Sequence, residues 1–180
     1  MSGAAATGAP APVETRPLVV VLCTGNAARS VMAGAVLERA PVRLVTAGTH
    51  VVEGQPMSFR TRMALEVIGL PGVTHRSRQL READVREAVL VVAMAGDHVA
   101  YVRRTYPSAS AKTATIRRLC RDLDDDGRPL AERVRSLSLA EVEVELWEDV
   151  ADPAGGELED YVACAKELLV LGTELASRLG

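Results

Sequence analysis

The sequence predicts an α/β fold built on a parallel sheet. Short apolar segments rich in valine alternate with segments of helical periodicity, an alternation that is typical of α/β domains. The first apolar segment has no polar face, as expected for a strand buried on both sides of a parallel sheet. The chain has 180 residues, enough for one domain with a sizeable core.

Four apolar segments predict the strands of the sheet. In chain order they cover residues 17–22, 42–47, 88–94 and 113–119. The first runs into a glycine-containing loop, the second precedes Gly48, and the third is apolar throughout, whereas the fourth fits the pattern only loosely. Ligands of such sheets bind beyond the carboxyl ends of the strands, so we expect the loop after the first strand to lie at the site.

Four segments with helical periodicity predict the main helices, at residues 29–40, 56–68, 97–104 and 157–179. Pro41 ends the first helix, because the residue before a proline disfavours helical backbone. Gly69 and Pro71 close the second. The fourth is long and amphipathic, and we expect it to close the domain. Residues 138–147 predict a short extra helix before it.

Residues 1–16 are rich in alanine and proline and predict a disordered tail ahead of a domain of residues 17–180.

Composition excludes several classes of protein. The net charge of −3 gives no electrostatic reason to expect nucleic acid as a partner. No run approaches the ~18 apolar residues of a membrane span. The N-terminus lacks the pattern of a secretory signal, so we expect a cytoplasmic protein, monomeric or weakly dimeric.

Three widely spaced cysteines argue against a disulfide framework or a zinc site. In a reducing compartment, Cys23 is a candidate nucleophile because it opens a glycine-containing loop. Cys120 and Cys164 are interpreted as small buried hydrophobes. The acidic run at 122–127 imitates the start of a calcium loop, but the twelfth position is Arg133, where such a loop needs glutamate. We interpret that run as a solvated turn.

Residues 23–30 read Cys-Thr-Gly-Asn-Ala-Ala-Arg-Ser and predict a phosphate-binding loop. The loop runs into a helix N-terminus, where unpaired N–H groups and the helix dipole favour an anion. We expect Gly25 to let the backbone curl without a Cβ clash, and Asn26 to tolerate a positive φ. Arg29 supplies a fork of donors for two phosphate oxygens.

The same loop is expected to activate its cysteine. Helix N–H groups, the Arg29 guanidinium and the Ser30 hydroxyl all stabilise a thiolate at Cys23. A thiolate that faces a bound phosphorus atom is placed for in-line attack, which forms a cysteinyl phosphate. The other residues expected to hold substrate are Thr24, Gly25, Asn26, Ala27, Ala28 and Ser30.

Asp152 is the candidate general acid that protonates the leaving oxygen. It lies in the segment Val-Ala-Asp-Pro-Ala-Gly-Gly, in which Pro153 rigidifies the loop and two glycines let it reach over a pocket. The alternative is that Asp152 only caps the last helix.

With these residues in place, the chain resembles the low-molecular-weight protein tyrosine phosphatases over roughly residues 18–175. Residues 23–30 are similar to the signature Cys-x-Gly-Asn-x-Cys-Arg-Ser of that family, and Asp152-Pro153 resembles its general-acid loop. Three further segments are similar and occur in the same order: Thr-Ala-Gly-Thr at 46–49, Gly-Gln-Pro at 54–56 and His-Arg-Ser-Arg-Gln-Leu at 75–80.

The resemblance implies a flavodoxin-like, three-layer α/β/α fold with a four-stranded parallel sheet. It implies that Cys23 is the nucleophile, Arg29 the phosphate clamp and Ser30 the thiolate stabiliser, and that Asp152 serves as acid and then as base for water. Asn26, Thr46 and His75 would form a hydrogen-bond network that supports the loop. No metal or cofactor is implied, and the partner is a phosphorylated protein or a small phosphorylated molecule. His50 and His98 are interpreted as surface residues.

Three departures from the family bear on oxidation and on substrate. Ala28 replaces the second loop cysteine, which protects the nucleophile by a reversible disulfide, so oxidation of Cys23 should go further. In the family, a branched apolar residue at position 27 suits phosphotyrosine and threonine suits phosphoarginine, but here it is Ala27. The aromatic pair after Asp-Pro is replaced by Ala154-Gly155. Trp147 either supplies a substitute wall or anchors the extra helix at 138–147 to the core.

The leading interpretation is a phosphatase that hydrolyses phosphotyrosine in proteins. Alternatives are a phosphatase for phosphoarginine or a small molecule, a thiol-linked arsenate reductase, and a phosphate-binding module with little turnover. The reductase needs further cysteines near the site, and only Cys120 is conceivable. Cys23, Arg29 and Asp152 together argue against a mere binding module.

Overall fold

The predicted α/β fold is confirmed by a computed structural model, which describes residues 15–180. Its four parallel strands lie in the order β2-β1-β3-β4. Their bounds are β1 (Leu18–Cys23), β2 (Arg43–Gly48), β3 (Leu90–Ala93) and β4 (Thr113–Thr115). The predicted tail at residues 1–16 lies outside the described residues, apart from its last two.

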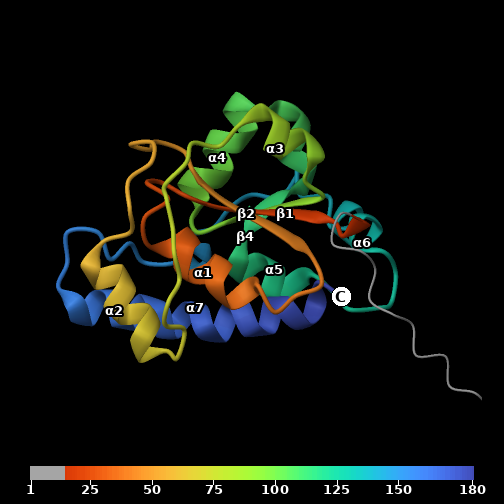
Figure 1. Ribbon diagram of the computed structural model, residues 1–180. Helices are drawn as coiled ribbons and strands as arrows, with labels where there is room; N and C mark the ends of the chain where they lie inside the picture. The colour runs from red at the N-terminus through yellow and green to blue at the C-terminus, as the bar shows by residue number, and fades with distance from the viewer. Residues whose placement is uncertain (1–14) are drawn as a thin grey trace, which may run out of the picture.

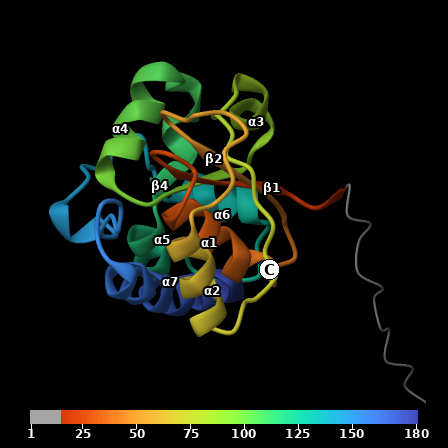
Figure 2. The same ribbon diagram turned by 60° about the vertical axis from the view of Figure 1, so that its left-hand side comes forward.

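Helices cover both faces of the sheet, and Figures 1 and 2 show the resulting three layers. The helices are α1 (Arg29–Leu37), α2 (Phe59–Val67), α3 (Glu82–Glu87), α4 (Gly96–Thr105), α5 (Ile116–Asp122), α6 (Leu130–Ser136) and α7 (Leu158–Arg178), with 3-10 turns η2 (Pro107–Lys112) and η3 (Leu146–Glu148). In Figure 1, α3 and α4 lie above the sheet, and α1, α5 and α7 lie below it.

The central strand β1 divides the core in two. Val19 and Val21 pack with α1, α5 and α7, whereas Val20 and Leu22 pack with α3 and α4. This division follows from the strand geometry, which turns successive side chains to opposite faces. Because β1 is buried along its whole length, the loop that follows it starts from a rigid support.

Two predictions about the last third of the chain are wrong. The fourth strand ends at Thr115 and does not continue to residue 119, because the Thr115 hydroxyl accepts a hydrogen bond from the Arg118 N–H at 3.2 Å and caps α5. The extra helix at 138–147 does not form. Residues 138–145 form turns and irregular chain that lead into η3, and Arg103 donates to the carbonyl oxygens of Leu139 and Val142 at 2.7 and 2.8 Å.

Glu148 anchors the segment that leads toward Asp152. Its carboxylate is fully buried, forms an ion pair with Arg118 and accepts the Thr115 hydroxyl at 2.6 Å. Burial raises the pKa of Glu148, but the hydrogen bonds from Arg118 and Thr115 outweigh burial, so the net pKa is lowered.

Glu148→Ala is expected to destabilise the fold by about 3–5 kcal/mol at neutral pH, because it removes the fully buried one of the carboxylates that pair with the buried Arg118 guanidinium. Since the folded-state pKa is below the unfolded value, Glu148 stabilises the fold above the unfolded pKa, and this contribution is lost as pH falls through the folded pKa. Urea denaturation at neutral and acidic pH measures both effects. Glu145→Ala, at a largely exposed partner of Arg118, should cost less than about 1 kcal/mol. Equal midpoints for wild type and Glu148→Ala at neutral pH would contradict the prediction.

Candidate active site

The loop between β1 and α1 ends at a helix N-terminus that no side chain caps. Ala28 occupies the N-cap position and has no polar side chain to offer the N–H groups of the first turn. Such a terminus combines unpaired donors with the positive end of the helix dipole. The predicted phosphate-binding loop therefore has the backbone of an anion site.

The end of β2 fixes the first half of this loop. The Thr49 N–H donates to the Cys23 carbonyl and the His50 N–H donates to the Thr24 carbonyl, both at 3.0 Å. Gly48 allows this close approach, because a Cβ at position 48 would clash with the Thr24 carbonyl and lie 2.9 Å from the Asn26 nitrogen. The steric role predicted for Gly25 is wrong, since a Cβ there meets no atom within 4 Å.

Asn26 joins the loop to the segment before α3. It is fully buried, and its φ of +49° is the left-handed conformation that the sequence predicts. Its side-chain oxygen accepts the Arg78 N–H at 2.9 Å. Its carbonyl oxygen accepts His75 Nε2 at 2.6 Å and the Ser77 hydroxyl at 2.8 Å. Every one of these contacts holds the loop in its curled form.

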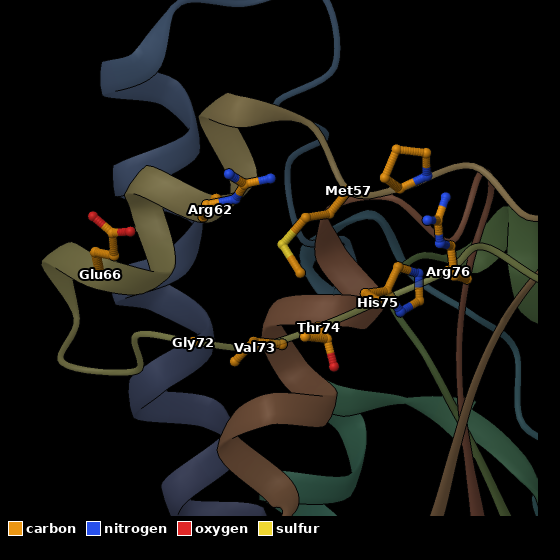
Figure 3. Close-up of a pocket in the computed structure, with 9 residues that line it drawn as sticks. Met57, Arg62, Glu66, Gly72, Val73, Thr74, His75 and Arg76 are labelled. Atoms are coloured by element: carbon orange, nitrogen blue, oxygen red, sulfur yellow. The ribbon is translucent and has the colours of Figure 1, made fainter.

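His75 donates to this carbonyl and therefore carries its proton on Nε2. Burial lowers the pKa of His75, although the bond to Asn26 opposes that shift, so the neutral ring is favoured. Figure 3 shows that the ring also borders a cavity of about 510 Å³ between α2 and residues 72–76, together with Met57 and Val73. His75, which supports the loop through Asn26, can therefore be reached from the molecular surface.

Cys23 lies at the base of the loop and is 3% exposed. Its Sγ is 3.0 Å from the Ser30 hydroxyl, which also accepts a hydrogen bond from Asn26 Nδ2 at 2.9 Å. Because an amide nitrogen can only donate, the Ser30 hydrogen is left to donate to the sulfur. A hydroxyl that donates to sulfur favours the thiolate form.

Arg29 and Asp152 meet across the mouth of the loop. Arg29 is almost fully buried; its Nη1 donates to the Val150 carbonyl at 3.2 Å, and its Nη2 forms an ion pair with Asp152 Oδ2. The Asp152 side chain is 45% exposed, and its Oδ1 accepts the Ala154 N–H at 3.1 Å. The helix-cap alternative for Asp152 is wrong, because Glu157 holds the N-cap position of α7.

His98 is buried, so its interpretation as a surface residue is wrong, whereas His50 is exposed as predicted. The ring lies in the first turn of α4, and its Nε2 is 3.0 Å from the Thr24 hydroxyl. Burial lowers the pKa of His98 to about 4, and the nearby Arg29 charge acts in the same direction. A neutral imidazole therefore contacts the loop at neutral pH.

The supporting network differs from the one implied by the resemblance. Thr46 packs against α1, where a Cβ at Gly34 would lie 2.5 Å from its methyl group. Within residues 15–180, the Thr46 hydroxyl makes no hydrogen bond. Ser77 and Arg78 take part instead, and sequence reasoning missed both, although they adjoin His75 in a matching segment.

Cys120 and Cys164 are buried, as predicted, and burial raises the pKa of their thiols to about 11 and about 12. The Trp147 ring lies 5.5 Å from the Arg118 guanidinium and 4.6 Å from that of Arg121. Both arginines belong to α5, so the contacts favour the anchor interpretation of Trp147 over the substitute wall.

Residues 15–180 contain no cluster of three or more histidine, cysteine or acidic side chains arranged to hold a metal ion. None of the helices in this part of the chain has both the length and the apolar character needed to cross a membrane.

Comparisons with known proteins agree with these features. The family model for low molecular weight phosphotyrosine protein phosphatase matches residues 18–180. The protein-arginine-phosphatase of Geobacillus stearothermophilus is 31% identical over 89% of this chain and 95% of its own length. A probable low molecular weight protein-tyrosine-phosphatase, EpsP of Ralstonia solanacearum, is 33% identical over 61% of this chain and 78% of its own.

Solved structures show the same similarity. The YwlE arginine phosphatase from Geobacillus stearothermophilus superposes with a TM-score of 0.72 at 31% identity, covering 91% of this chain and 92% of that one. The low molecular weight protein tyrosine phosphatase from T. tengcongensis superposes with a TM-score of 0.70 at 28% identity, covering 89% and 98%. The chain therefore belongs to the low molecular weight phosphotyrosine protein phosphatase family of cysteine-dependent phosphatases.

Proposed function

We propose that this protein removes phosphate from phosphorylated proteins through a cysteinyl-phosphate intermediate, with phosphotyrosine as the leading substrate. One observation carries the proposal. The Cys23 sulfur accepts a hydrogen bond from Ser30 at the base of a loop that leads into an uncapped helix N-terminus, and Arg29 and Asp152 pair at the mouth of this loop. A nucleophile, an anion site and an acid meet there, and phosphoryl transfer from an ester needs these three groups.

In the first step, loop N–H groups and Arg29 bind the phosphate oxygens. The substrate phosphate takes the place of the Asp152 carboxylate on the Arg29 guanidinium. The Cys23 thiolate attacks phosphorus in line, so the P–S bond forms as the P–O ester bond breaks. The electron pair of that bond stays on the leaving oxygen. Asp152 takes up a proton from solvent when it leaves the guanidinium, and it gives this proton to the leaving oxygen.

In the second step, water hydrolyses the intermediate. The Asp152 carboxylate takes a proton from the water molecule, whose oxygen attacks phosphorus as the P–S bond breaks. The electron pair of this bond returns to the sulfur, Cys23 becomes a thiolate again, and inorganic phosphate leaves. Asp152 ends this step protonated, and it returns the proton to solvent if it pairs with Arg29 again in the empty site.

Phosphoarginine in proteins is the second candidate substrate. The specific observation in its favour is the 31% identity to a protein-arginine-phosphatase over 89% of this chain. In addition, the side chains of Ala27 and Ala154 are small. Neither of them offers a ring or a branched group that would pack on the phenyl ring of phosphotyrosine.

An assay of the purified protein tests the proposal. We expect phosphate release from nitrophenyl phosphate and from a phosphotyrosine or phosphoarginine peptide, and no thiol-dependent reduction of arsenate. The Cys120 thiol, which donates to the Leu171 carbonyl at 3.3 Å, is poorly suited to carry a catalytic disulfide. Binding of phosphate without hydrolysis of any of these compounds would overturn the proposal in favour of a binding module.

Peroxide is expected to inactivate the enzyme, and Ala28→Cys to improve recovery by dithiothreitol several-fold. A sulfenic acid at Cys23 would condense with the introduced thiol to a disulfide, releasing water, and a reductant would restore both thiols. In the wild type, burial keeps Cys120 and Cys164 in the thiol form. Residual activity before and after reduction measures recovery. Detection by mass spectrometry of a disulfide between Cys23 and either of these cysteines in the oxidised wild type would contradict this account.

A further inference from the structure

A groove of about 550 Å³ lies between the start of α2 and the start of α7, two helices that pack side by side (Figure 1). Six residues line it: Ser58, Phe59, Arg60, Glu157, Leu158 and Glu159. Its volume falls in the range of ligand-binding sites, and its walls come from two rigid elements.

Both walls of the groove connect to the catalytic loop. In the first turn of α2, the Thr61 hydroxyl donates to the Ala27 carbonyl at 2.9 Å. The other wall follows the Asp152 loop directly along the chain. Arg60 and Glu157 form an ion pair at 3.2 Å that joins the two walls. The groove therefore adjoins the cradle, which is the phosphate-binding loop of residues 23–30.

Phe59 supplies a large apolar surface to this groove. It is the one phenylalanine of the chain, and it is 68% exposed in the first helical position of α2. Ser58 fixes that position, because its hydroxyl accepts the Thr61 N–H at 3.1 Å and caps the helix. Leu158, half-buried, faces the same groove. The groove thus exposes an aromatic ring and an aliphatic side chain to any molecule that enters it.

The charges of the groove define the side chain that fits it. Glu157 is paired with Arg60, but the exposed Glu159 makes no ion pair within residues 15–180. A lysine or arginine side chain has an aliphatic stem that can pack on Phe59 and Leu158, and a cation that can pair with Glu159. The same cation gains from the face of an aromatic ring.

We propose that Phe59 is a specificity-determining residue, and that this groove binds a lysine or arginine close to the phosphorylated residue of a polypeptide substrate. This inference rests on the proposed phosphatase function and narrows its substrate class. A small phosphoester fills only the cradle, so it gains nothing from the groove. The contribution of the groove should therefore appear with peptides and be absent with nitrophenyl phosphate.

The experiment compares kcat/KM for phosphopeptides that differ only in flanking residues, which are lysine, leucine, alanine or glutamate. The phosphorylated residue is whichever one the wild type hydrolyses. We expect lysine to exceed glutamate by about tenfold, or about 1.4 kcal/mol, mainly through KM because the groove lies away from the reacting atoms. Phe59→Ala and Glu159→Gln should each remove most of that preference and leave kcat/KM for nitrophenyl phosphate within about twofold.

Matched controls lie elsewhere on the surface. Val170→Ala removes a similarly exposed apolar side chain from α7, and Glu132→Gln neutralises an exposed carboxylate on α6; neither should change the preference. Equal rates for all flanking residues, or a preference that survives both Phe59→Ala and Glu159→Gln, would overturn the inference while nitrophenyl phosphate is still turned over. Failure of the wild type on every phosphorylated compound would instead overturn the proposed function.

Discussion

Cys23→Ser is expected to lower kcat by at least about 10⁴-fold, the order of loss that follows removal of a catalytic nucleophile. The serine hydroxyl keeps its proton at neutral pH, and Ser30, which donates to the sulfur at 3.0 Å in the wild type, cannot make it a good nucleophile. Phosphate release from nitrophenyl phosphate measures the loss. Residual hydrolysis within tenfold of wild type would exclude Cys23 as the nucleophile.

Anion binding should survive the same substitution, because the anion site is built from backbone N–H groups and Arg29, not from the sulfur. Calorimetric titration with tungstate is expected to give a Kd for Cys23→Ser within a few-fold of the wild-type value. Cys120→Ser, at a buried thiol on α5, is the matched control and should keep full kcat. Loss of tungstate binding in Cys23→Ser would mean that the substitution disrupts the loop itself.

Asp152→Ala is expected to lower kcat by about 10²–10⁴-fold for alkyl phosphates, the usual contribution of a general acid. Nitrophenolate needs a proton much less, so the loss with nitrophenyl phosphate should be smaller. The ratio of the two losses is the measurement. Equal losses for both substrates would show that Asp152 is not the acid.

The ion pair with Arg29 predicts a second effect of Asp152→Ala. In the empty site Asp152 occupies one arm of the guanidinium, and phosphate must displace it. Removing the carboxylate also removes a negative charge from the mouth of the cradle. The Ki for inorganic phosphate should therefore fall, whereas Asp149→Asn, at a neighbouring acid that accepts the Gly96 N–H at 2.7 Å, should leave it nearly unchanged.

The sequence was most informative where local pattern and packing agree. The valine run of β1, the glycine-containing loop and the start of α1 follow from residues close together in the chain, and so does the left-handed backbone of Asn26. The boundary between β4 and α5 could not be found in this way. Ile116 follows Thr115 as it would in a longer strand, and the capping hydrogen bond of the Thr115 side chain marks the point where the chain becomes helical.

Other features depend on contacts between distant segments, which periodicity does not report. His98 is buried because the first turn of α4 abuts Thr24, which follows the central strand β1. Arg103 determines the shape of residues 138–145 through their carbonyl oxygens. The place of Phe59 beside Leu158 likewise required the packing of α2 on α7.

The hydrogen bonds of the catalytic loop have a consequence for the order of folding. Asn26 is held by Arg78, 52 residues away, and Arg29 by the Val150 carbonyl, 121 residues away. Closing such long loops costs entropy that only nearly complete tertiary structure repays, and parallel strand pairing is itself slow. During refolding, helical circular dichroism should therefore recover before phosphate affinity. The recovery of activity during refolding therefore reports when the long-range contacts of Asn26 and Arg29 form, and these are expected to be among the last.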